Sequence, residues 1–402
     1  MMEQSTAARI GVAYSLLTLS DGALRMLVLF HYYQLGYTAL DLALVFVIYE
    51  ACGIIVNMTG GRIAQRLGLL QTMRLGIALQ LFTLIGLSIP GYTAPLWAVM
   101  LWQGSAGVAK DITKISAKSA IATLARHAGQ GGLFGAISLL TGAKNTLKGV
   151  GFFVGGALLL AFGAQNAFLG LAGVVATGLV LTFGIHSEIG TTKVKQLGAL
   201  FAKSPAVNRL SFARIFLFGA RDVWLAIALP LFLAQAPGWG FWQAGAVMAA
   251  YTIGYGVIQA TTPRLLHGRR APDGVLTAML AVFPMVVCLL TAAAHWWWPQ
   301  SVWIILGGVL CFSVVFALNS ALHSYLITAY ATEHQLSLDI GFYYSANALG
   351  RLLGTVASGL GYMAFGMTGV MIGAGVALIP AVVAAWPLPR PQGTVTVSDH
   401  SE

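Results

Sequence analysis

The sequence predicts an all-α membrane protein with twelve transmembrane helices, for three reasons. Of its 402 residues, 58% are hydrophobic and only 8% are charged, and the mean hydropathy is +0.81. Apolar stretches of about 20 residues or more, each long enough to cross a bilayer, fill nearly the whole chain. Charged residues nevertheless recur inside these stretches, where a bilayer tolerates them only at a substantial cost. The chain therefore has little soluble mass, and its intramembrane charges are candidates for function.

Turn-forming residues separate the predicted spans. The expected breaks are Gly36-Tyr37, Pro90-Gly91, Gly163-Ala164, Pro237-Gly238, Pro299-Gln300 and Gly366. The twelve spans have approximate centres at residues 21, 51, 80, 108, 148, 175, 220, 252, 282, 314, 351 and 377. No signal-peptide pattern precedes the first span. The second span is expected to begin with a capping box formed by Thr38 and Asp41.

A polar connector at about residues 186–205 divides the chain. Residues 1–185 are predicted to form one six-helix half and residues 206–388 another, followed by a polar tail over 389–402. A weak internal repeat supports this division, because a shift of 201 residues aligns Asp21 with Asp222 and a shift of 203 aligns Lys148 with Arg351. Two related halves around a central cavity, with substrate bound near the bilayer midplane, are the plan of the major facilitator fold.

The distribution of basic residues predicts the orientation. One set of short loops has no Lys or Arg, whereas the opposite set is rich in them. Because Lys and Arg are retained on the cytoplasmic side, both termini and the connector are predicted to be cytoplasmic, in a bacterial inner membrane. The basic residues concerned are Arg62, Arg66, Arg74, Arg126, Lys193, Lys195, Lys203, Arg264, Arg269, Arg270 and Arg390.

Several function classes lack support in the sequence. The net charge of +10 lies in short loops and within spans, which does not favour a nucleic-acid partner. The three cysteines fall in separate apolar segments without any metal-ligand spacing, so no metal site or cofactor is expected. No nucleophile and base constellation indicates an enzyme, and the loops are too short for the sensory domain of a receptor.

Two glycine patterns resemble signatures of the major facilitator superfamily, and both have plainer alternatives. Residues 61–68 (GRIAQRLG) resemble the loop signature G-x-x-x-D-R/K-x-G, with Gln65 in place of the Asp, and a simple basic loop is an equal alternative. The fifth span partly matches the glycine-rich antiporter signature through Gly142, Gly151, Gly155 and Gly156. Because the proline and final glycine pair of that signature are missing, close helix packing is the favoured interpretation.

Two rows of lysines are the most informative charges. Lys110, Lys114 and Lys118 recur every fourth residue in the fourth span, and Lys144 and Lys148 do so in the fifth. Residues four apart share a helix face, so the first row forms a stripe about 12 Å long. Lys118 is near the cytoplasmic end and can snorkel, whereas Lys110 lies too deep for that. We expect both rows to face a shared central cavity that holds an anion.

The intramembrane charges leave a positive surplus of three. Seven deep cations face four acids, Asp21, Glu50, Asp111 and Asp222, with Asp111 placed to pair with Lys114. An anion, water or deprotonated lysines must offset the surplus. Arginine suits phosphate through its planar fork, and lysine acts as a mobile point charge. The predicted substrate-binding residues are Arg25, Lys110, Lys114, Lys144, Asn145, Lys148, Arg221 and Arg351.

Asp21, Glu50 and Asp222 are the predicted proton carriers. Glu50 stands alone near the middle of its span, where desolvation favours the protonated form, and a polar contact to a neighbouring span is an equal alternative. Asp21 is four residues from Arg25, so the two can pair along one helix. Asp222 directly follows Arg221, so we expect these two side chains to point apart. The weaker candidates for proton transfer are His31 and His323.

Residues 15–160 closely resemble the ArsJ-type organoarsenical efflux permeases of the major facilitator superfamily. The resemblance rests on the stretches SDGALRMLVLFH, GYTALDLALVFVIYE, GIIVNMTGGRIAQRLGL, AGVAKDITKISAKSAI and TGAKNTLKGVGFFVGGALL. It implies export of 1-arseno-3-phosphoglycerate, an unstable ester made when glyceraldehyde-3-phosphate dehydrogenase uses arsenate instead of phosphate. The dehydrogenase would be a functional partner, and proton antiport would drive arsenate resistance. The alternative is a permease for another phosphorylated metabolite or a drug.

Overall fold

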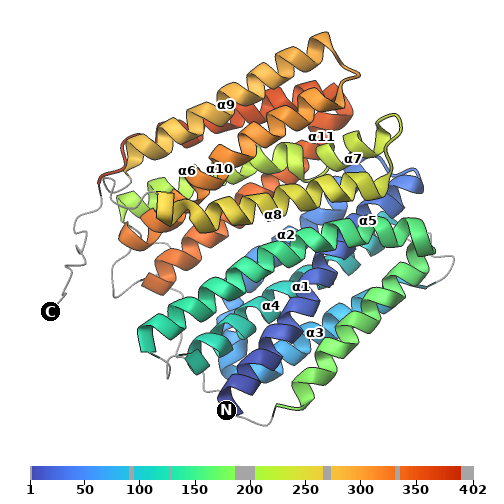
Figure 1. Cartoon of the computed structure of the whole chain (residues 1–402), viewed down its shortest axis with the longest axis vertical. Coiled ribbons are helices and arrows are strands. Elements are labelled where there is room, and N and C mark those ends of the chain that lie inside the picture. Colours follow the sequence, from blue (N-terminus) through green and yellow to red (C-terminus); the bar gives the residue numbers. More distant parts are fainter. Residues whose placement is uncertain are drawn as a thin grey trace.

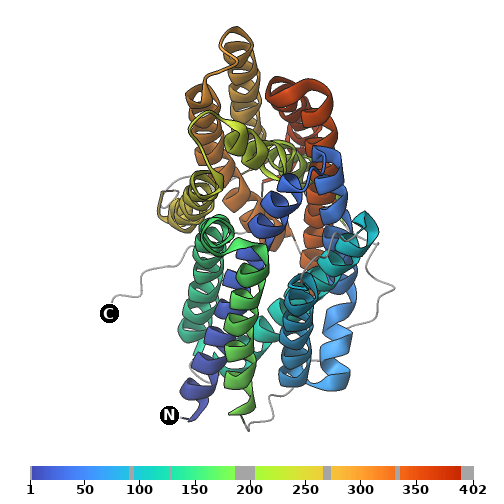
Figure 2. The same ribbon diagram turned by 90° about the vertical axis from the view of Figure 1, so that its right-hand side faces the viewer.

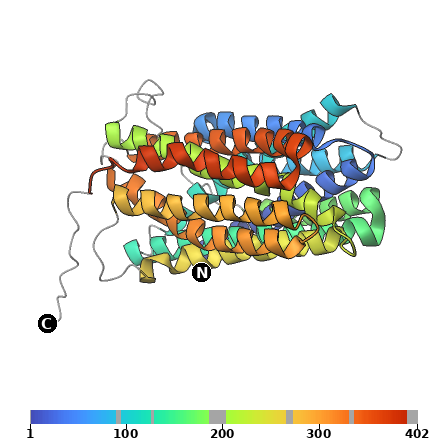
Figure 3. The same ribbon diagram turned by 90° about the horizontal axis from the view of Figure 1, so that it is seen from above.

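The computed structural model describes residues 2–89, 95–125, 129–185, 204–265, 273–330 and 336–390. All regular secondary structure in these ranges is α-helical, and the helices run side by side along one direction (Figure 3). The first half of the chain forms five of these helices. They are α1 (Met2–Gln34), α2 (Ala39–Leu67), α3 (Leu69–Leu87), α4 (Leu96–Ala125) and α5 (Gly129–Phe183).

The second half of the chain forms the remaining six helices of the described residues. They are α6 (Pro205–Leu225), α7 (Ala228–Gln235), α8 (Phe241–Leu265), α9 (Gly274–Trp297), α10 (Val302–Tyr330) and α11 (Leu336–Ala385). Helices α6 and α7 follow one another closely and form one apolar stretch, Pro205–Gln235. In Figures 1 and 2, the helices of the first half lie together on one side and those of the second half on the other.

Two glycines divide the longest helices. Gly163 in α5 has φ 70° and Gly366 in α11 has φ 59°, which are left-handed values that glycine adopts without steric cost. Both helices fold back on themselves at these points (Figure 1). The predicted breaks at Gly163, Gly366, Gly36 and Pro237-Gly238 are confirmed, and Gly36 and Gly238 also have positive φ. Pro299-Gln300 lies between α9 and α10, whereas Pro90-Gly91 lies outside the described residues.

The chain is a multi-pass membrane protein. Eight helical stretches of the described residues are long and apolar enough to cross a bilayer. Two of them, Lys144–Phe183 and Gly341–Ala385, have 40 and 45 residues and contain the glycine breaks. Large apolar side chains cover the outside of the bundle, as lipid contact requires. The tryptophans Trp296, Trp297 and Trp298 are more than half exposed at the end of α9.

The predicted loop over residues 61–68 is wrong. Helix α2 continues to Leu67, and the turn into α3 consists of Gly68 alone, with φ 84°. The segment contains good helix formers and no proline, so one glycine with positive φ is sufficient to end the helix. The side chains of Arg62 and Gln65 lie outside the described part of the structure. The capping box of Thr38 and Asp41 at the start of α2 is confirmed.

Glycines bring α5 against both neighbouring helices. A Cβ at Gly151 or Gly155 would collide with the backbone of α1 at Leu19 or Ala23. A Cβ at Gly156 would collide with the start of α8. Three of the glycines of the antiporter-like pattern therefore serve close helix packing, as favoured above.

Basic side chains gather at the end of the bundle where the chain begins. Arg9 donates to the carbonyl oxygen of Gly184 at 2.6 Å, and Arg74 donates to that of Thr182 at 2.6 Å. In the second half, Arg390 pairs with Asp273 at 3.1 Å. This is the end predicted to be cytoplasmic. Most of the polar connector and of the tail lie outside the described residues.

Candidate functional site

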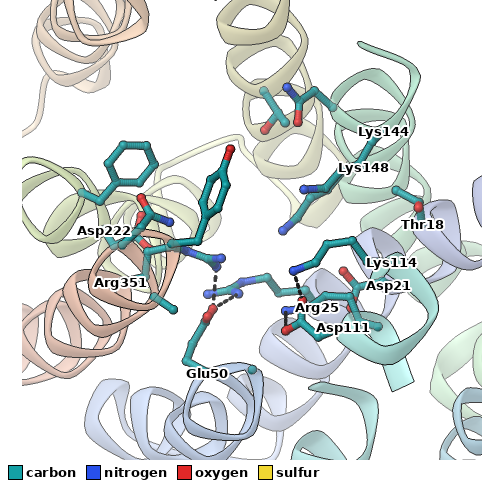
Figure 4. Close-up of a pocket in the computed structure, with 18 of the residues that line it drawn as sticks. Thr18, Asp21, Arg25, Glu50, Asp111, Lys114, Lys144, Lys148, Asp222 and Arg351 are labelled. Carbon is teal, nitrogen blue, oxygen red and sulfur yellow. Dashed lines mark hydrogen bonds and ion pairs between the residues drawn. The ribbon is translucent and has the colours of Figure 1, made fainter. Parts of the chain in front are cut away.

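A cavity of about 500 Å³ lies between the two halves of the bundle. Residues of α1, α2, α4 and α5 line it from one side, and residues of α6, α8, α10 and α11 line it from the other. All eleven residues predicted for substrate binding or proton transfer line this one cavity, and Figure 4 shows many of them directed into it. They are Asp21, Arg25, Glu50, Lys110, Lys114, Lys144, Asn145, Lys148, Arg221, Asp222 and Arg351.

The lysines of α4 share one carboxylate. Lys114 forms an ion pair with Asp111, as predicted, and donates to Asn57 Oδ1 at 2.9 Å. Lys110 Nζ lies 3.5 Å from the same carboxylate and 4.0 Å from the ring centroid of Tyr49. One negative charge therefore serves two amines, and this part of the wall remains positive.

The lysines of α5 have no carboxylate partner among the described residues. Lys144 and Lys148 both point into the cavity (Figure 4). The Nζ of Lys148 lies over the ring of Phe152, 5.6 Å from the ring centroid. Gly22 in α1 lets the backbone at Lys148 approach closely, since a Cβ there would lie 2.6 Å from the Lys148 carbonyl oxygen. We call Lys144 and Lys148 the lysine wall.

Three arginines and two carboxylates form a continuous ionic chain across the cavity. Arg25 lies 3.2 Å from Glu50, and Arg351 lies 2.5 Å from the same Glu50 oxygen (Figure 4). Arg351 also contacts Asp222 at 3.2 Å, and Asp222 is 2.5 Å from Arg221. Glu50 belongs to the first half and Arg351 to the second, so this arginine network joins the two halves.

The network corrects three pairing predictions. Arg25 pairs with Glu50, whereas Asp21 accepts a hydrogen bond from Tyr49 at 2.7 Å, so the predicted Asp21–Arg25 pair is wrong. Glu50 is not alone, because guanidinium groups from two other helices reach it. Arg221 curls back onto the adjacent Asp222, which was expected to point away from it. A guanidinium on a long flexible stem reaches partners that helix periodicity alone does not place on its face.

Arg214 is a cavity residue that the sequence reasoning missed. Its side chain is nearly buried, and it lines the cavity from α6 two turns before Arg221. Lys118 lines the cavity as well, so these two residues raise the cations of the cavity wall from seven to nine, against four carboxylates, and the formal surplus is five rather than three. The spacing of seven residues between Arg214 and Arg221 places both on one helix face, and that signal was available in the sequence.

The histidines do not line the cavity. The ring of His31 contacts Tyr32 and Phe168, and His323 is buried in α10. Within the described ranges, no group of three or more His, Cys, Asp or Glu side chains is placed to hold a metal ion.

The two halves are also tied together beyond the cavity, at the end opposite the chain termini. Gln235 bridges two tyrosines: it donates to Tyr33 at 2.9 Å and accepts from Tyr362 at 2.7 Å. The rings of Phe30 and Phe241 stack nearby across the same boundary, with centroids 4.8 Å apart. Because Tyr33 and Phe30 belong to the first half, these contacts connect the halves near the turns at Gly36 and Gly238.

Comparison with known proteins places this fold. No protein-family model and no curated protein sequence matches the chain. Among solved structures, it resembles one of a proton-dependent oligopeptide transporter, with a TM-score of 0.73 and 16% identity over 95% of this chain and 97% of the other. It also resembles a POT family transporter in complex with 5-aminolevulinic acid, with a TM-score of 0.76 and 13% identity over 94% of each chain. The chain has the major facilitator fold.

A nucleoside transporter, NupG, is similar to the same extent, with a TM-score of 0.70 and 14% identity over 95% of this chain and 98% of the other. Identities this low establish the arrangement of the helices and leave the substrate open. In the major facilitator fold the substrate site lies where the two halves meet, near the membrane midplane. The charged cavity of this chain likewise lies where the two halves meet.

Proposed function

We propose that this chain is a secondary active exporter of an organoarsenate or organophosphate anion. The substrate that the sequence resemblance implies is 1-arseno-3-phosphoglycerate, and its export from a bacterial cytoplasm would confer arsenate resistance. The membrane would be the inner membrane. The two halves would rock about the central cavity to expose it to either side in turn.

The observation that carries this proposal is the lysine wall. Two amines face a cavity between the halves, and no carboxylate among the described residues neutralises them. A charged group held in such a place is costly, so it is retained where a ligand of opposite charge arrives. A small anion that carries phosphate or arsenate oxygens supplies that charge and accepts hydrogen bonds from the amines.

The chemistry of the lining favours an organic ester over free arsenite. Trivalent arsenic is bound by soft thiolates, and no cysteine is among the described residues that line the cavity. Oxyanions of pentavalent arsenic and phosphorus are hard acceptors that suit ammonium and guanidinium groups. The ester hydrolyses readily, so glyceraldehyde-3-phosphate dehydrogenase would have to supply it on the same side of the membrane.

Asp21 is the best placed of the three candidate proton carriers. Glu50 and Asp222 are each held in ion pairs with two guanidinium groups. Asp21 accepts one hydrogen bond from Tyr49 and has no ion pair among the described residues. It also lines the cavity on α1, so protonation and anion binding can influence one another. The resemblance to proton-dependent transporters of this fold supports coupling to protons, and export would require that coupling to be antiport.

The topology that we propose has twelve crossings with both termini cytoplasmic. Eight apolar stretches are evident, and the two that contain Gly163 and Gly366 are long enough for two crossings each. Helices α4 and α8 supply the other two, since their 30 and 25 residues are sufficient to span a bilayer. The charges in α4 that lower its hydropathy are the lysines that face the cavity.

Arsenic export that depends on the dehydrogenase tests this proposal. Cells that express the chain together with glyceraldehyde-3-phosphate dehydrogenase should grow in arsenate and release arsenic, whereas cells with either protein alone should not. The Lys144→Gln/Lys148→Gln double variant is the matched loss-of-function chain, and Arg390→Gln is a control that removes a charge outside the cavity. Equal release of arsenite without the dehydrogenase would contradict the proposal. Release of another phosphorylated metabolite would favour the alternative permease.

A further inference from the structure

Arg214 is held in place without a carboxylate. Its Nε donates to Asn347 Oδ1 at 3.0 Å, and its Nη1 donates to the carbonyl oxygen and hydroxyl of Ser320 at 3.3 and 3.2 Å. The guanidinium lies 3.7 Å from the ring centroid of Phe218. Groups on α6, α10 and α11 therefore fix the orientation of this side chain, which is only 4% exposed.

These hydrogen bonds do not use the Nη2 nitrogen of the Arg214 guanidinium. A guanidinium has five N–H donors in a planar fork, and the bonds to Asn347 and Ser320 use those of Nε and Nη1. The two donors of Nη2 have no hydrogen-bond partner in the described part of the chain. Because Arg214 lines the cavity, a molecule that enters it can reach them. Because Asn347 and Ser320 are neutral, they do not neutralise the positive charge of Arg214.

The other arginines of the cavity differ in this respect. Arg25 contacts Glu50, Arg351 contacts Glu50 and Asp222, and Arg221 contacts Asp222. The contacts of Arg214 are neutral instead, and Tyr255, another residue of the cavity wall, lies 2.9 Å from the Ser320 hydroxyl that Arg214 contacts. A fixed cation with two free N–H donors among neutral polar groups is suited to bind an oxyanion.

We propose that Arg214 is the anion-binding group of the second half, with Nη2 donating to phosphate, arsenate or carboxylate oxygens of the transported molecule. This proposal rests on the proposed function and adds to it Arg214, an anion-binding residue on the side of the cavity that the second half forms. The lysine wall belongs to the first half and Arg214 to the second. An anion that contacts both therefore bridges the halves, and its binding can favour one arrangement of them over another.

Binding of 3-phosphoglycerate, a stable oxyanion probe, to the purified full-length protein tests the role of Arg214. Removing one charge-assisted contact should weaken binding by about 10- to 150-fold in Arg214→Gln. Arg390→Gln, which removes an exposed arginine at the end of the bundle, should bind like the unmodified protein. Thermal melting of each variant shows whether it is folded. A folded Arg214→Gln variant that binds as tightly as the unmodified protein would overturn the proposal.

A second variant covers the case in which Arg214→Gln does not fold. Arg214→Lys keeps the positive charge, but its three donors cannot make the three bonds to Asn347 and Ser320 and also present two further donors to an anion. We expect it to fold and to bind 3-phosphoglycerate about tenfold less tightly or worse. Unchanged binding in a folded Arg214→Lys variant would overturn the role of the fork.

The same measurements separate this proposal from the proposed function. If Lys148→Gln weakens binding and Arg214→Gln does not, the anion exporter stands and Arg214 is not part of its site. If the unmodified protein binds none of 3-phosphoglycerate, inorganic phosphate and inorganic arsenate, the proposed function itself fails, and with it the role of Arg214.

Discussion

The arginine network and the lysine wall line the same cavity but treat their charges differently. In the arginine network, each guanidinium contacts a carboxylate, and the contact between Arg351 and Glu50 at 2.5 Å crosses from one half to the other. In the lysine wall, Lys144 and Lys148 have no carboxylate partner among the described residues. Both regions are cationic and both are shielded from lipid, so neither burial nor residue type alone explains the difference.

The difference indicates two roles for buried charge in one cavity. Charges that are paired across the boundary hold the halves in one arrangement, and breaking such a pair leaves an uncompensated charge in a poorly hydrated place. Charges without a partner have a high affinity for an anion from solution. An arriving anion can also compete with Glu50 and Asp222 for Arg351, which would loosen the contact between the halves when substrate binds.

The largest effect is expected from breaking the arginine network at its centre. Glu50→Gln removes the negative charge that both Arg25 and Arg351 contact, so Arg25 loses its carboxylate partner and Arg351 keeps only Asp222. The loss of one member of a buried pair costs about 3–5 kcal/mol. Thermal melting in detergent should therefore show a clear decrease in Tm. Asp21→Asn is the matched control, because it removes a carboxylate of the same cavity that has only one hydrogen bond.

A Glu50→Gln variant with unchanged stability would show that Glu50 is not a structural partner of the arginines. Glu50 would then again be a candidate proton carrier. If Glu50→Gln is destabilised yet still uses a proton gradient to transport the anion uphill, Asp21 remains the candidate coupling residue. Vesicle transport driven by a proton gradient, measured for both variants, distinguishes these outcomes.

An intermediate effect, on binding and not on stability, is expected from the lysine wall. Lys148→Gln removes an unpaired charge, so the folded protein loses little, whereas the anion loses a charge-assisted contact worth about 1.5–3 kcal/mol. That corresponds to a decrease in affinity of about 10- to 150-fold. Isothermal titration with 3-phosphoglycerate, alongside Arg390→Gln, measures the change. Equal binding by Lys144→Gln, Lys148→Gln and the unmodified protein would contradict the assignment of the wall to the anion site.

The smallest effect is expected at the neutral contacts that join the halves beyond the cavity. Tyr33→Phe removes the hydroxyl that accepts from Gln235 and should cost about 0.5–1.5 kcal/mol in the arrangement seen here. The equilibrium between the arrangement of the halves seen here and the one that opens the cavity to the other side of the membrane should shift by a few-fold. The affinity for the anion in the arrangement seen here should not change. Distances between labels on the two halves, measured by electron paramagnetic resonance, report this equilibrium. A shift as large as that of Glu50→Gln would show that the neutral contacts are as important as the ionic ones.

Local properties of the sequence were sufficient for most helix breaks and for most of the charged residues of the cavity. Apolar stretches and turn residues predicted the breaks at Gly36, Gly163 and Gly366, because length, hydropathy and backbone freedom are properties of a few neighbouring residues. Helix periodicity placed Lys110 and Lys114 on one face, and the cost of charge in a bilayer requires that face to avoid lipid. Eleven of the residues that line the cavity could therefore be predicted without knowing the tertiary structure.

The tertiary structure alone decided which charges pair. Glu50 appeared isolated because its partners, Arg25 and Arg351, are on other helices and one is 301 residues away. Helix periodicity favoured Asp21 as the partner of Arg25. The long side chain of Arg25 instead reaches Glu50 on α2, because that helix packs beside α1. The partners of Arg214 were likewise beyond local prediction, since they come from α10 and α11. Pairing depends on how helices and halves are placed against one another, and that placement results from packing over the whole chain, which no local pattern contains.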